Sequence, residues 1–363
     1  MKKALALVMS ACLAFSLVAC GGETTSTSSE AASSEAASSE AASSEAASSE
    51  AAAPAAEAGV KTGMAIVSKT STSDADADAE GNAQVDSTVA AVLVGEDGKI
   101  ISCKLDVAQN KVAVAADGSF ENTAEFQSKQ ELKEKYNMKP ASAIGKEWYE
   151  QANAFADYLV GKTAEEVRAI EVGGDHNGPV DADIAASCTM NVTDMIEAVA
   201  QAVESAQVLG ATAEDTLGLG VNTEMSHYNA IPADNEGEGS LQTDTTYAAV
   251  TYGADGKITS SIWDCTQAKF STTEEGAVAA KDAEIVSKQN LQDKYGMKPA
   301  SPIGKEWFEQ AQAYAAWMVG KTAEDVKAIE VGGDHNGPVD ADIAASCTMD
   351  VLQFNGAVEK ALA

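Results

Sequence analysis

The chain has 363 residues and a formal net charge of −32, with 24 Lys and Arg against 56 Asp and Glu. This acidity argues against nucleic acid and against anionic membrane surfaces as partners of the folded part. Six cysteines are too few for a disulfide-stapled scaffold of this length.

The first twenty residues predict export and lipidation. Lys2 and Lys3 precede a short apolar run that ends in Leu-Val-Ala-Cys at 17–20. This order is typical of a lipoprotein signal peptide, and the run is too short to span a bilayer. We expect residues 1–20 to be the signal peptide and lipobox, and Cys20 to carry the lipid. The protein then lies on the outer face of the cell membrane of a Gram-positive-type bacterium, held by its lipid anchor alone. A plain secretory signal is the alternative.

Residues 21–61 are predicted to be a disordered tether. They repeat Glu-Ala-Ala-Ser-Ser and then become rich in Ala and Pro, with no aromatic residue. Such a composition cannot bury enough apolar surface to offset the entropy of ordering the chain.

Beyond the tether the sequence aligns with itself. The Asp-Gly-Lys-Ile at 97–100 recurs at 255–258, and the Gly-Lys-Glu-Trp at 145–148 recurs at 304–307. Each copy has the size of an ordinary domain. We therefore expect two tandem repeats, at 62–208 and 212–363.

Both copies carry the same order of expected elements. Strand-like runs at 88–94 and 99–107, split by a turn at 95–98, recur at 245–252 and 257–265. A helix follows at 147–160, then a short helix opened by a capping box at 163–166, and finally a helix carrying Ile196, Val199 and Val203. Strands first and helices afterwards predict an α+β fold with a small antiparallel sheet in each repeat.

One run is identical in the two copies. AIEVGGDHNGPVDADIAASCTM stands at 169–190 and again at 328–349. Its glycines, Asn-Gly-Pro and small residues predict irregular backbone with tight turns between two helices. Because other parts of the copies have diverged, this identity suggests a functional constraint, although local gene conversion would leave the same pattern.

The residues around this run resemble the FMN-binding domain. The resemblance rests on Gly-Lys-Thr at 161–163 followed by Glu-Glu-Val, on Val-Asp at 180–181, on a small-residue segment with two hydroxyl residues, and on a closing Ala/Val helix. The Asp-Gly-Lys-Ile strand region is similar as well, so most of each repeat is covered. The family occurs in flavin-carrying subunits of sodium-pumping NADH:quinone oxidoreductase, in related ferredoxin-linked complexes and in extracytosolic flavin lipoproteins.

In that family a flavin transferase esterifies FMN to a Thr or Ser within Asp-x-x-Ser-Gly-Ala-Thr/Ser-x-Thr. The resemblance implies an acidic position, an acceptor hydroxyl and a following hydroxyl in each copy. These are Asp181, Ser187 and Thr189 in the first repeat and Asp340, Ser346 and Thr348 in the second. The sequence departs from the pattern at Ile184 and Ala185, where the family has Ser and Gly, and at Cys188 between the hydroxyls.

The resemblance implies a membrane-anchored extracytosolic flavoprotein that carries electrons, a carrier more than a catalyst, with up to two covalent FMN groups. Its partners would be the flavin transferase, a membrane quinol or flavoprotein donor, and an extracellular acceptor. Trp148 and Trp307 are candidate walls for the flavin ring, although their helical spacing favours the core.

The alternative is a non-redox surface lipoprotein that binds a small ligand or metal ion through the repeated acidic run. Oxygen, nitrogen and sulfur ligands are available there, but the spacing matches neither an EF-hand nor a zinc motif. The candidates are Asp175, His176, Asn177, Asp181, Asp183 and Cys188. Without a Cys-x-x-Cys pair, the cysteines of the folded part are expected to be buried side chains rather than redox thiols, namely Cys103, Cys188, Cys265 and Cys347.

Overall fold

The structure, a computed structural model, describes residues 59–120, 126–229 and 238–363. The predicted signal peptide, Cys20 and the tether up to residue 58 lie outside the described residues. In the described part of the chain, no helix is both long enough and apolar enough to cross a membrane.

The first repeat is a three-stranded antiparallel sheet followed by helices. The strands are β1 (Lys61–Ser73), β2 (Gly81–Val94) and β3 (Ile100–Val114), in that order across the sheet. The helices are α1 (Lys129–Leu132), α2 (Trp148–Leu159), α3 (Ala164–Arg168), α4 (Ala182–Ala185) and α5 (Thr193–Glu204). Two 3-10 turns, η1 (Lys133–Tyr136) and η2 (Lys139–Ala141), and a small hairpin, β4 (Val172–Gly173) with β5 (Gly178–Pro179), complete it.

The second repeat has the same plan with one added edge strand. Its sheet is β6 (Thr216–Asn229), β7 (Gly239–Tyr252), β8 (Ile258–Thr272) and β9 (Val278–Ala280). After it come α6 (Lys288–Leu291), η3 (Gln292–Tyr295), α7 (Trp307–Trp317), α8 (Ala323–Lys327), the hairpin β10 (Val331–Gly332) with β11 (Gly337–Pro338), α9 (Ala341–Ala344) and α10 (Leu352–Ala361). The α+β prediction, with antiparallel sheets followed by helices, is confirmed. The first strand of each sheet, β1 and β6, was not predicted.

Strand β2 explains how the sheets are covered. From Val89 to Val94 every side chain is at most 1% exposed, although successive side chains point to opposite faces. Ala90, Val92 and Val94 pack with α2 and α5 of their own repeat. Val89 and Leu93, on the other face, pack with strands of the second repeat. Each sheet is therefore buried on both faces.

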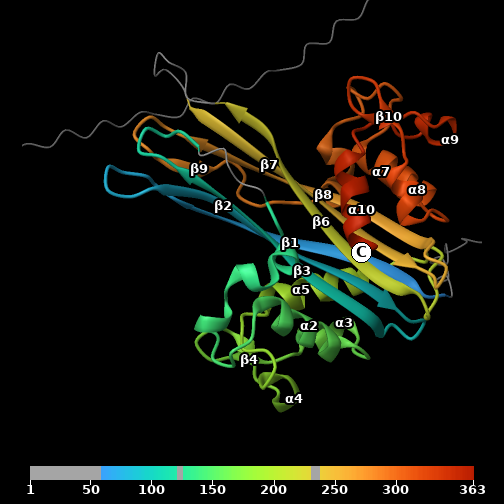
Figure 1. Ribbon diagram of the computed structural model, residues 1–363, viewed down its shortest axis with the longest axis horizontal. Helices are drawn as coiled ribbons and strands as arrows, with labels where there is room; N and C mark the ends of the chain where they lie inside the picture. The colour runs from blue at the N-terminus through green and yellow to red at the C-terminus, as the bar shows by residue number, and fades with distance from the viewer. Residues whose placement is uncertain (1–58, 121–125, 230–237) are drawn as a thin grey trace, which may run out of the picture. The chain divides into compact units, whose positions relative to one another are not determined.

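The two sheets pack against each other, so the order of layers is helices, sheet, sheet, helices (Figure 1). One shared cluster joins Met64 and Leu93 to Leu217 and Tyr247. Buried polar contacts cross the same interface: Asn110 Nδ2 donates to Thr245 Oγ1 at 2.9 Å. Residues 56–363 accordingly form one compact unit.

Glycines let the long helices lie directly on the first strands. A Cβ on Gly220 of β6 would stand 1.8 Å from the carbonyl oxygen of Ala357 in α10. A Cβ on Gly63 of β1 would stand 2.0 Å from the carbonyl oxygen of Ala202 in α5. A side chain at either position has no room unless the helix moves, because both obstacles are backbone atoms.

We expect Gly220→Ala to lower the free energy of unfolding by about 1–3 kcal/mol, because α10 must shift away from β6. Guanidinium denaturation followed by circular dichroism measures the change. Gly253→Ala is the matched control, since its nearest obstacle is the movable Asp255 carboxylate at 3.2 Å. Equal midpoints for the two variants would contradict this account of the packing.

Candidate functional site

The repeated run folds in the same way in both copies, as a tight hairpin followed by a one-turn helix. In the second copy Gly333 and Asn336 take positive φ angles of 72° and 48° in the turn between β10 and β11. Gly337 lies against the backbone of Thr348, whose carbonyl oxygen would be 3.0 Å from a Cβ at this glycine. The two ends of the run are thus brought together, and the predicted turn-rich backbone between helices is confirmed.

Thr189 and Thr348 are held by equivalent buried glutamines. The N–H of Thr348 donates to Gln310 Oε1 at 2.9 Å, and its hydroxyl lies 3.3 Å from the same atom. Gln310 is fully buried, and its amide donates to Ser301 Oγ at 3.0 Å. In the first repeat Thr189 donates to Gln151 at 2.9 Å in the same way. Helices α2 and α7 therefore fix the position of these threonines.

Ser187 and Ser346 lie in the turn after the short helix and are half-buried. Their N–H groups bond back to the carbonyl oxygens of Ile184 at 2.8 Å and Ile343 at 2.7 Å. The residues just before them are alanines, which leave space around the hydroxyl groups.

Asp181 and Asp340 are N-caps of α4 and α9. Asp181 accepts from the N–H of Asp183 at 2.9 Å and from the Tyr158 hydroxyl at 2.8 Å. These two bonds, the backbone one first, lower the pKa of Asp181. Asp181 lines a surface hollow of about 460 Å³ with Tyr158 and Lys162, and Thr189 does not line it. The predicted acidic and hydroxyl positions therefore face different spaces.

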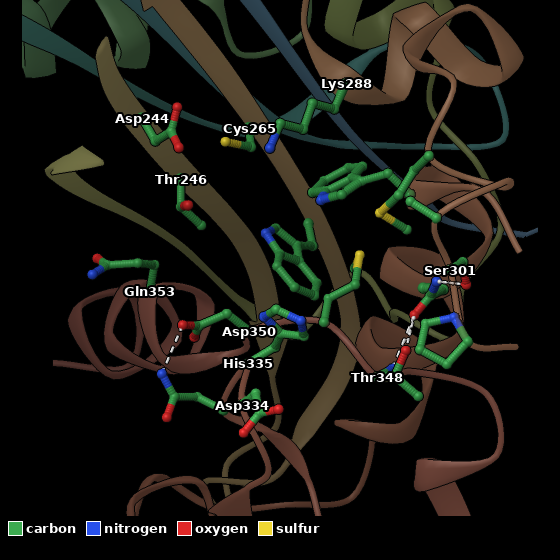
Figure 2. A pocket seen from close by; sticks show the side chains of 18 of the residues that line it. Asp244, Thr246, Cys265, Lys288, Ser301, Asp334, His335, Thr348, Asp350 and Gln353 are labelled. Atoms are coloured by element: carbon green, nitrogen blue, oxygen red, sulfur yellow. Dashed lines mark hydrogen bonds between the residues drawn. The ribbon is translucent and has the colours of Figure 1, made fainter. Parts of the chain in front are cut away.

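A cavity of about 440 Å³ lies in the second repeat, and Figure 2 shows its side chains. The repeated run contributes both of its ends: the hairpin turn supplies Asp334, His335 and Asn336, and the last residues supply Thr348 and Met349. The rest come from strands β6, β7 and β8, from helices α6, α7 and α10, from the loop at 297–302 before α7, and from Asp350 just before α10. Of the predicted site residues in this repeat, Thr348 lines the cavity, and Ser346 and Asp340 do not.

Two tryptophans form the wall of the cavity. The ring of Trp263 on β8 lies 5.3 Å from that of Trp307 and stacks on Phe354 at 4.6 Å. Trp263 is 3% exposed, and its Nε1 is buried without a hydrogen-bond partner. A buried donor left unpaired costs free energy, and this N–H has almost no accessible surface toward the cavity. Trp307 is both a core residue, as the helical spacing predicts, and a wall of the cavity.

More carboxylates than lysines line the cavity. Lys288 on α6 is 8% exposed, and its Nζ lies 4.9 Å from the centre of the Tyr295 ring and 5.4 Å from that of Trp307. Burial lowers the pKa of Lys288, but nearby Cys265, Tyr295 and Asp244 outweigh it and the pKa is raised. Four carboxylates line the same cavity, on Glu224, Asp244, Asp334 and Asp350. In Figure 2, Thr348 and Ser301 lie together on the side opposite Asp244 and Gln353.

Trp307 has a counterpart in Trp148 of the first repeat, but the Trp263 part of the wall is specific to the second repeat. By the strand registers, Leu105 stands in the first repeat where the second has Trp263. Lys69 likewise stands in the place of Glu224. Lys69 forms an ion pair of 2.5 Å with Asp194. The two repeats thus share the run but differ in the residues beside it.

Helix α6 is fastened to the sheet by a buried carboxylate that the sequence analysis missed. Asp264 Oδ1 accepts from the N–H groups of Cys265 at 2.7 Å and of Gln289 at 3.0 Å. Asp106 does the same in the first repeat, at 2.7 Å and 3.0 Å. Burial raises the pKa of both carboxyls to about 6, against the opposing effect of their hydrogen bonds. This contact sets the position of Lys288 over the cavity.

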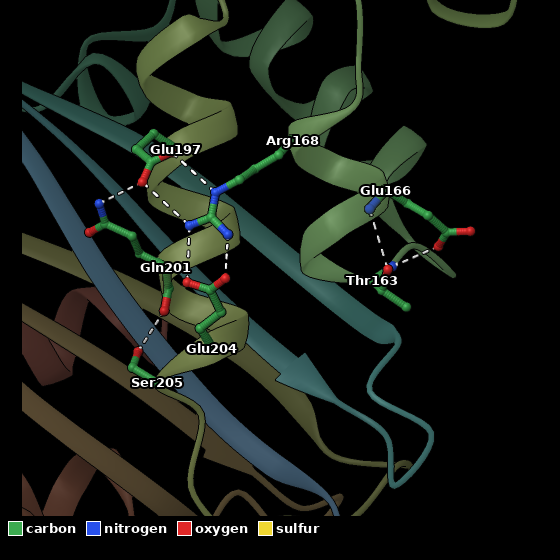
Figure 3. A network of polar contacts seen from close by, with 7 residues as sticks. All are labelled: Thr163, Glu166, Arg168, Glu197, Gln201, Glu204 and Ser205. Atoms are coloured by element: carbon green, nitrogen blue, oxygen red, sulfur yellow. Dashed lines mark hydrogen bonds and ion pairs between the residues drawn. The ribbon is translucent and has the colours of Figure 1, made fainter.

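In the first repeat an ion-pair network fixes the start of the repeated run (Figure 3). Arg168, the last residue of α3, pairs with Glu204 and, at 3.4 Å, with Glu197, both on α5. The predicted capping box is present: Thr163 Oγ1 accepts from the N–H of Glu166. The position at which the repeated run begins, directly after α3, is therefore fixed.

The cysteines of the folded part are buried side chains. Cys103, Cys188, Cys265 and Cys347 are all buried, as predicted, and none of the four forms a disulfide with another. Burial raises the pKa of Cys188 and Cys347 to about 11, so these thiols are protonated at neutral pH. In the described ranges, no three His, Cys, Asp or Glu side chains gather closely enough to hold a metal ion.

Comparison with known proteins gives a partial match. The chain is 34% identical over 94 residues to a chlorophenol reductase of Desulfitobacterium hafniense, a match that covers 22% of this chain and 29% of the relative. The chain thus spans less than a third of that protein's length. No family model matches the chain, and no solved structure matches it.

The buried Asp264 predicts a pH dependence of stability. Folding raises the pKa of Asp264 from 3.8 to about 6. The protonated carboxyl group therefore contributes to the free energy of unfolding below pH ~4, and this contribution is lost as the pH rises through about 6. We expect Asp264→Asn to gain stability relative to the wild type between pH 4 and 7, on the order of 2–3 kcal/mol. Urea denaturation at stepped pH measures the difference. The exposed control Asp282→Asn should keep the wild-type dependence of the free energy of unfolding on pH. If Asp264→Asn also kept this dependence, Asp264 would not be its source.

Proposed function

We propose that the protein is a membrane-anchored extracytosolic flavoprotein that carries electrons, with FMN esterified to Ser187 and Ser346. The proposal rests on the resemblance of each repeat to the FMN-binding domain. The observation that carries it is the tryptophan-walled cavity of the second repeat, which is lined by Thr348, two residues beyond Ser346.

The cavity suits a flat ring with carbonyl oxygens. Its volume of about 440 Å³ lies in the range of small-molecule sites. Trp263 and Trp307 offer apolar contacts where they line the cavity, and the Lys288 ammonium is a donor from which a ring oxygen can accept a hydrogen bond. FMN, when bound, supplies one- and two-electron redox chemistry. The chain's own residues hold the ring, exclude water from it and provide hydrogen-bond donors.

The phosphate group of FMN would lie more favourably outside the cavity than inside it. A free phosphate monoester carries a charge near −2 at neutral pH, and the carboxylates of Glu224, Asp244, Asp334 and Asp350 would repel it. Esterification turns the monoester into a diester with a single negative charge and fixes it beyond the lined space. Ser346 is half-buried, follows two alanines and does not line the cavity, which fits a site of attachment.

The carrier role follows from this arrangement together with the predicted lipid anchor. A membrane quinol or flavoprotein would reduce the bound flavin, and an extracellular acceptor would oxidise it. A flavin transferase would attach the FMN. The name of the partly matching relative, a chlorophenol reductase, accords with a redox role. The tether would let the folded part range between donor and acceptor.

A second candidate is a non-redox lipoprotein that binds an organic cation. It is favoured by the four carboxylates that surround Trp263 and Trp307, because cations are attracted both to carboxylates and to aromatic faces. Since no metal-holding cluster occurs in the described part of the chain, the ligand would be organic. Calorimetric titration with tetramethylammonium on the one hand and riboflavin on the other distinguishes the two functions.

Intact-mass spectrometry after co-expression with a flavin transferase tests the flavin proposal. We expect two FMN additions in the wild type, one each in Ser187→Ala and Ser346→Ala, and none in the double variant, because a phosphoester needs the hydroxyl. Thr189→Ala and Thr348→Ala are the matched controls and should keep both additions. A wild-type protein without added mass and without yellow colour would refute the proposal.

A further inference from the structure

Glu224 lies where two spaces meet. Its side chain lines the tryptophan-walled cavity and also a groove of about 430 Å³ between the repeats. The groove is lined by Phe126, Gln127 and Glu131 of the first repeat and by Met225 and Lys360 of the second. Glu224 is half-buried, and its side chain borders both the cavity and the groove.

A chain of hydrogen bonds holds this carboxyl in place. Gln353 Nε2 donates to Glu224 Oε2 at 2.6 Å, and Asn222 Nδ2 donates to Gln353 Oε1 at 2.6 Å. Lys360 Nζ donates to Asn222 Oδ1 at 3.3 Å and pairs with Glu131 at 2.7 Å. The chain thus runs from the first repeat to the cavity. It fixes Oε2 and leaves Oε1 as the oxygen that can carry a proton.

The surroundings of Glu224 favour its protonated form. Burial raises the pKa of Glu224, and Asp244 and Asp350 raise it further, while Gln353 and Lys288 act in the opposite direction. The titratable and charged groups that face it are Asp244 of β7, Lys288 of α6, Asp334 and His335 of the hairpin turn, Asp350 before α10, Lys360 of α10 and Glu131 of α1. Carboxylates outnumber cations among them, so a further negative charge in the cavity is disfavoured.

We propose that Glu224 is the proton-exchanging residue of the second-repeat cavity. This inference rests on the proposed flavin function. FMN held in the cavity would supply the two-electron redox chemistry, with the electrons coming from the membrane donor. The carboxyl group of Glu224 would donate its Oε1 proton to the reduced ring, and the resulting carboxylate would take one proton from water in the groove. In sum, two electrons and one proton would pass to the ring, and Glu224 would return to its starting state.

The first repeat has no carboxyl group at the position equivalent to Glu224. Lys69 stands at the position of Glu224, and its ammonium is paired with Asp194 at 2.5 Å. A flavin carried by the first repeat alone, in Ser346→Ala, would therefore serve as a separate reference, since its reduction would have no equivalent carboxyl beside it.

The test uses Glu224→Gln in the Ser187→Ala background, which leaves the flavin of the second repeat alone. We expect the midpoint potential of the parent to change its slope with pH where Glu224 titrates, and this change to vanish in Glu224→Gln. At a pH where Glu224 is protonated, the rate of reduction should fall at least about tenfold in the variant, since a positioned acid contributes roughly 10²–10⁴. Glu274→Gln, an exposed acid outside both spaces, is the matched control and should behave like the parent.

A readout without flavin keeps the two proposals separate. In the apo-protein, ¹³C NMR of labelled Glu side chains should show one carboxyl titrating above the ordinary glutamate range, and this signal should disappear in Glu224→Gln. An ordinary titration of Glu224, or an unchanged potential profile in the variant, overturns the role of Glu224. Absence of any bound flavin overturns the proposed function instead.

Discussion

The structure depends on the burial of each sheet on both faces. The outward face of the first sheet carries Val89 and Leu93, and the second sheet covers it with Leu217 and Tyr247. A repeat on its own would expose this apolar face to water, at roughly 25 cal/mol for each Å² uncovered. Asn110 and Thr245 set the register of the two sheets, because an unpaired amide at this depth would be costly. The two repeats therefore form one folded unit rather than two independently folded domains.

Pairing the sheets leaves the helical faces free to diverge. The shared run keeps its hairpin, its one-turn helix and its glutamine-held threonine in both copies. What differs is the strand face beneath it, where Trp263 replaces Leu105 and Glu224 replaces Lys69. The charge and the aromatic lining beside the run therefore differ between the repeats, while the run itself keeps the same fold. If each repeat holds a flavin as proposed, these different surroundings would give the two flavins different reduction potentials.

The sequence predicted the local features well and the cavity poorly. Turn residues, capping boxes and apolar runs act within a few positions, so the hairpins, the strands near Val89 and the helix at Trp148 could be recognised. Strand β1 was missed because its outer half is Ser- and Thr-rich, and strand β6 because glycine and polar residues break up its apolar positions. The cavity joins Glu224, Trp263, Lys288 and Thr348, which are distant in sequence and meet through tertiary packing. The replacement of Leu105 by Trp263 in the repeat alignment was the one available signal.

The most direct test of the account is a fluorescence titration of the flavin-free protein with lumiflavin, which has the ring without the phosphate. We expect saturable binding at one site, with Trp263→Leu, the residue of the first repeat, weakening it by tenfold or more, or about 1.4 kcal/mol. Absence of saturable binding, or equal affinity in the variant, would contradict the claim that this cavity holds a flavin ring.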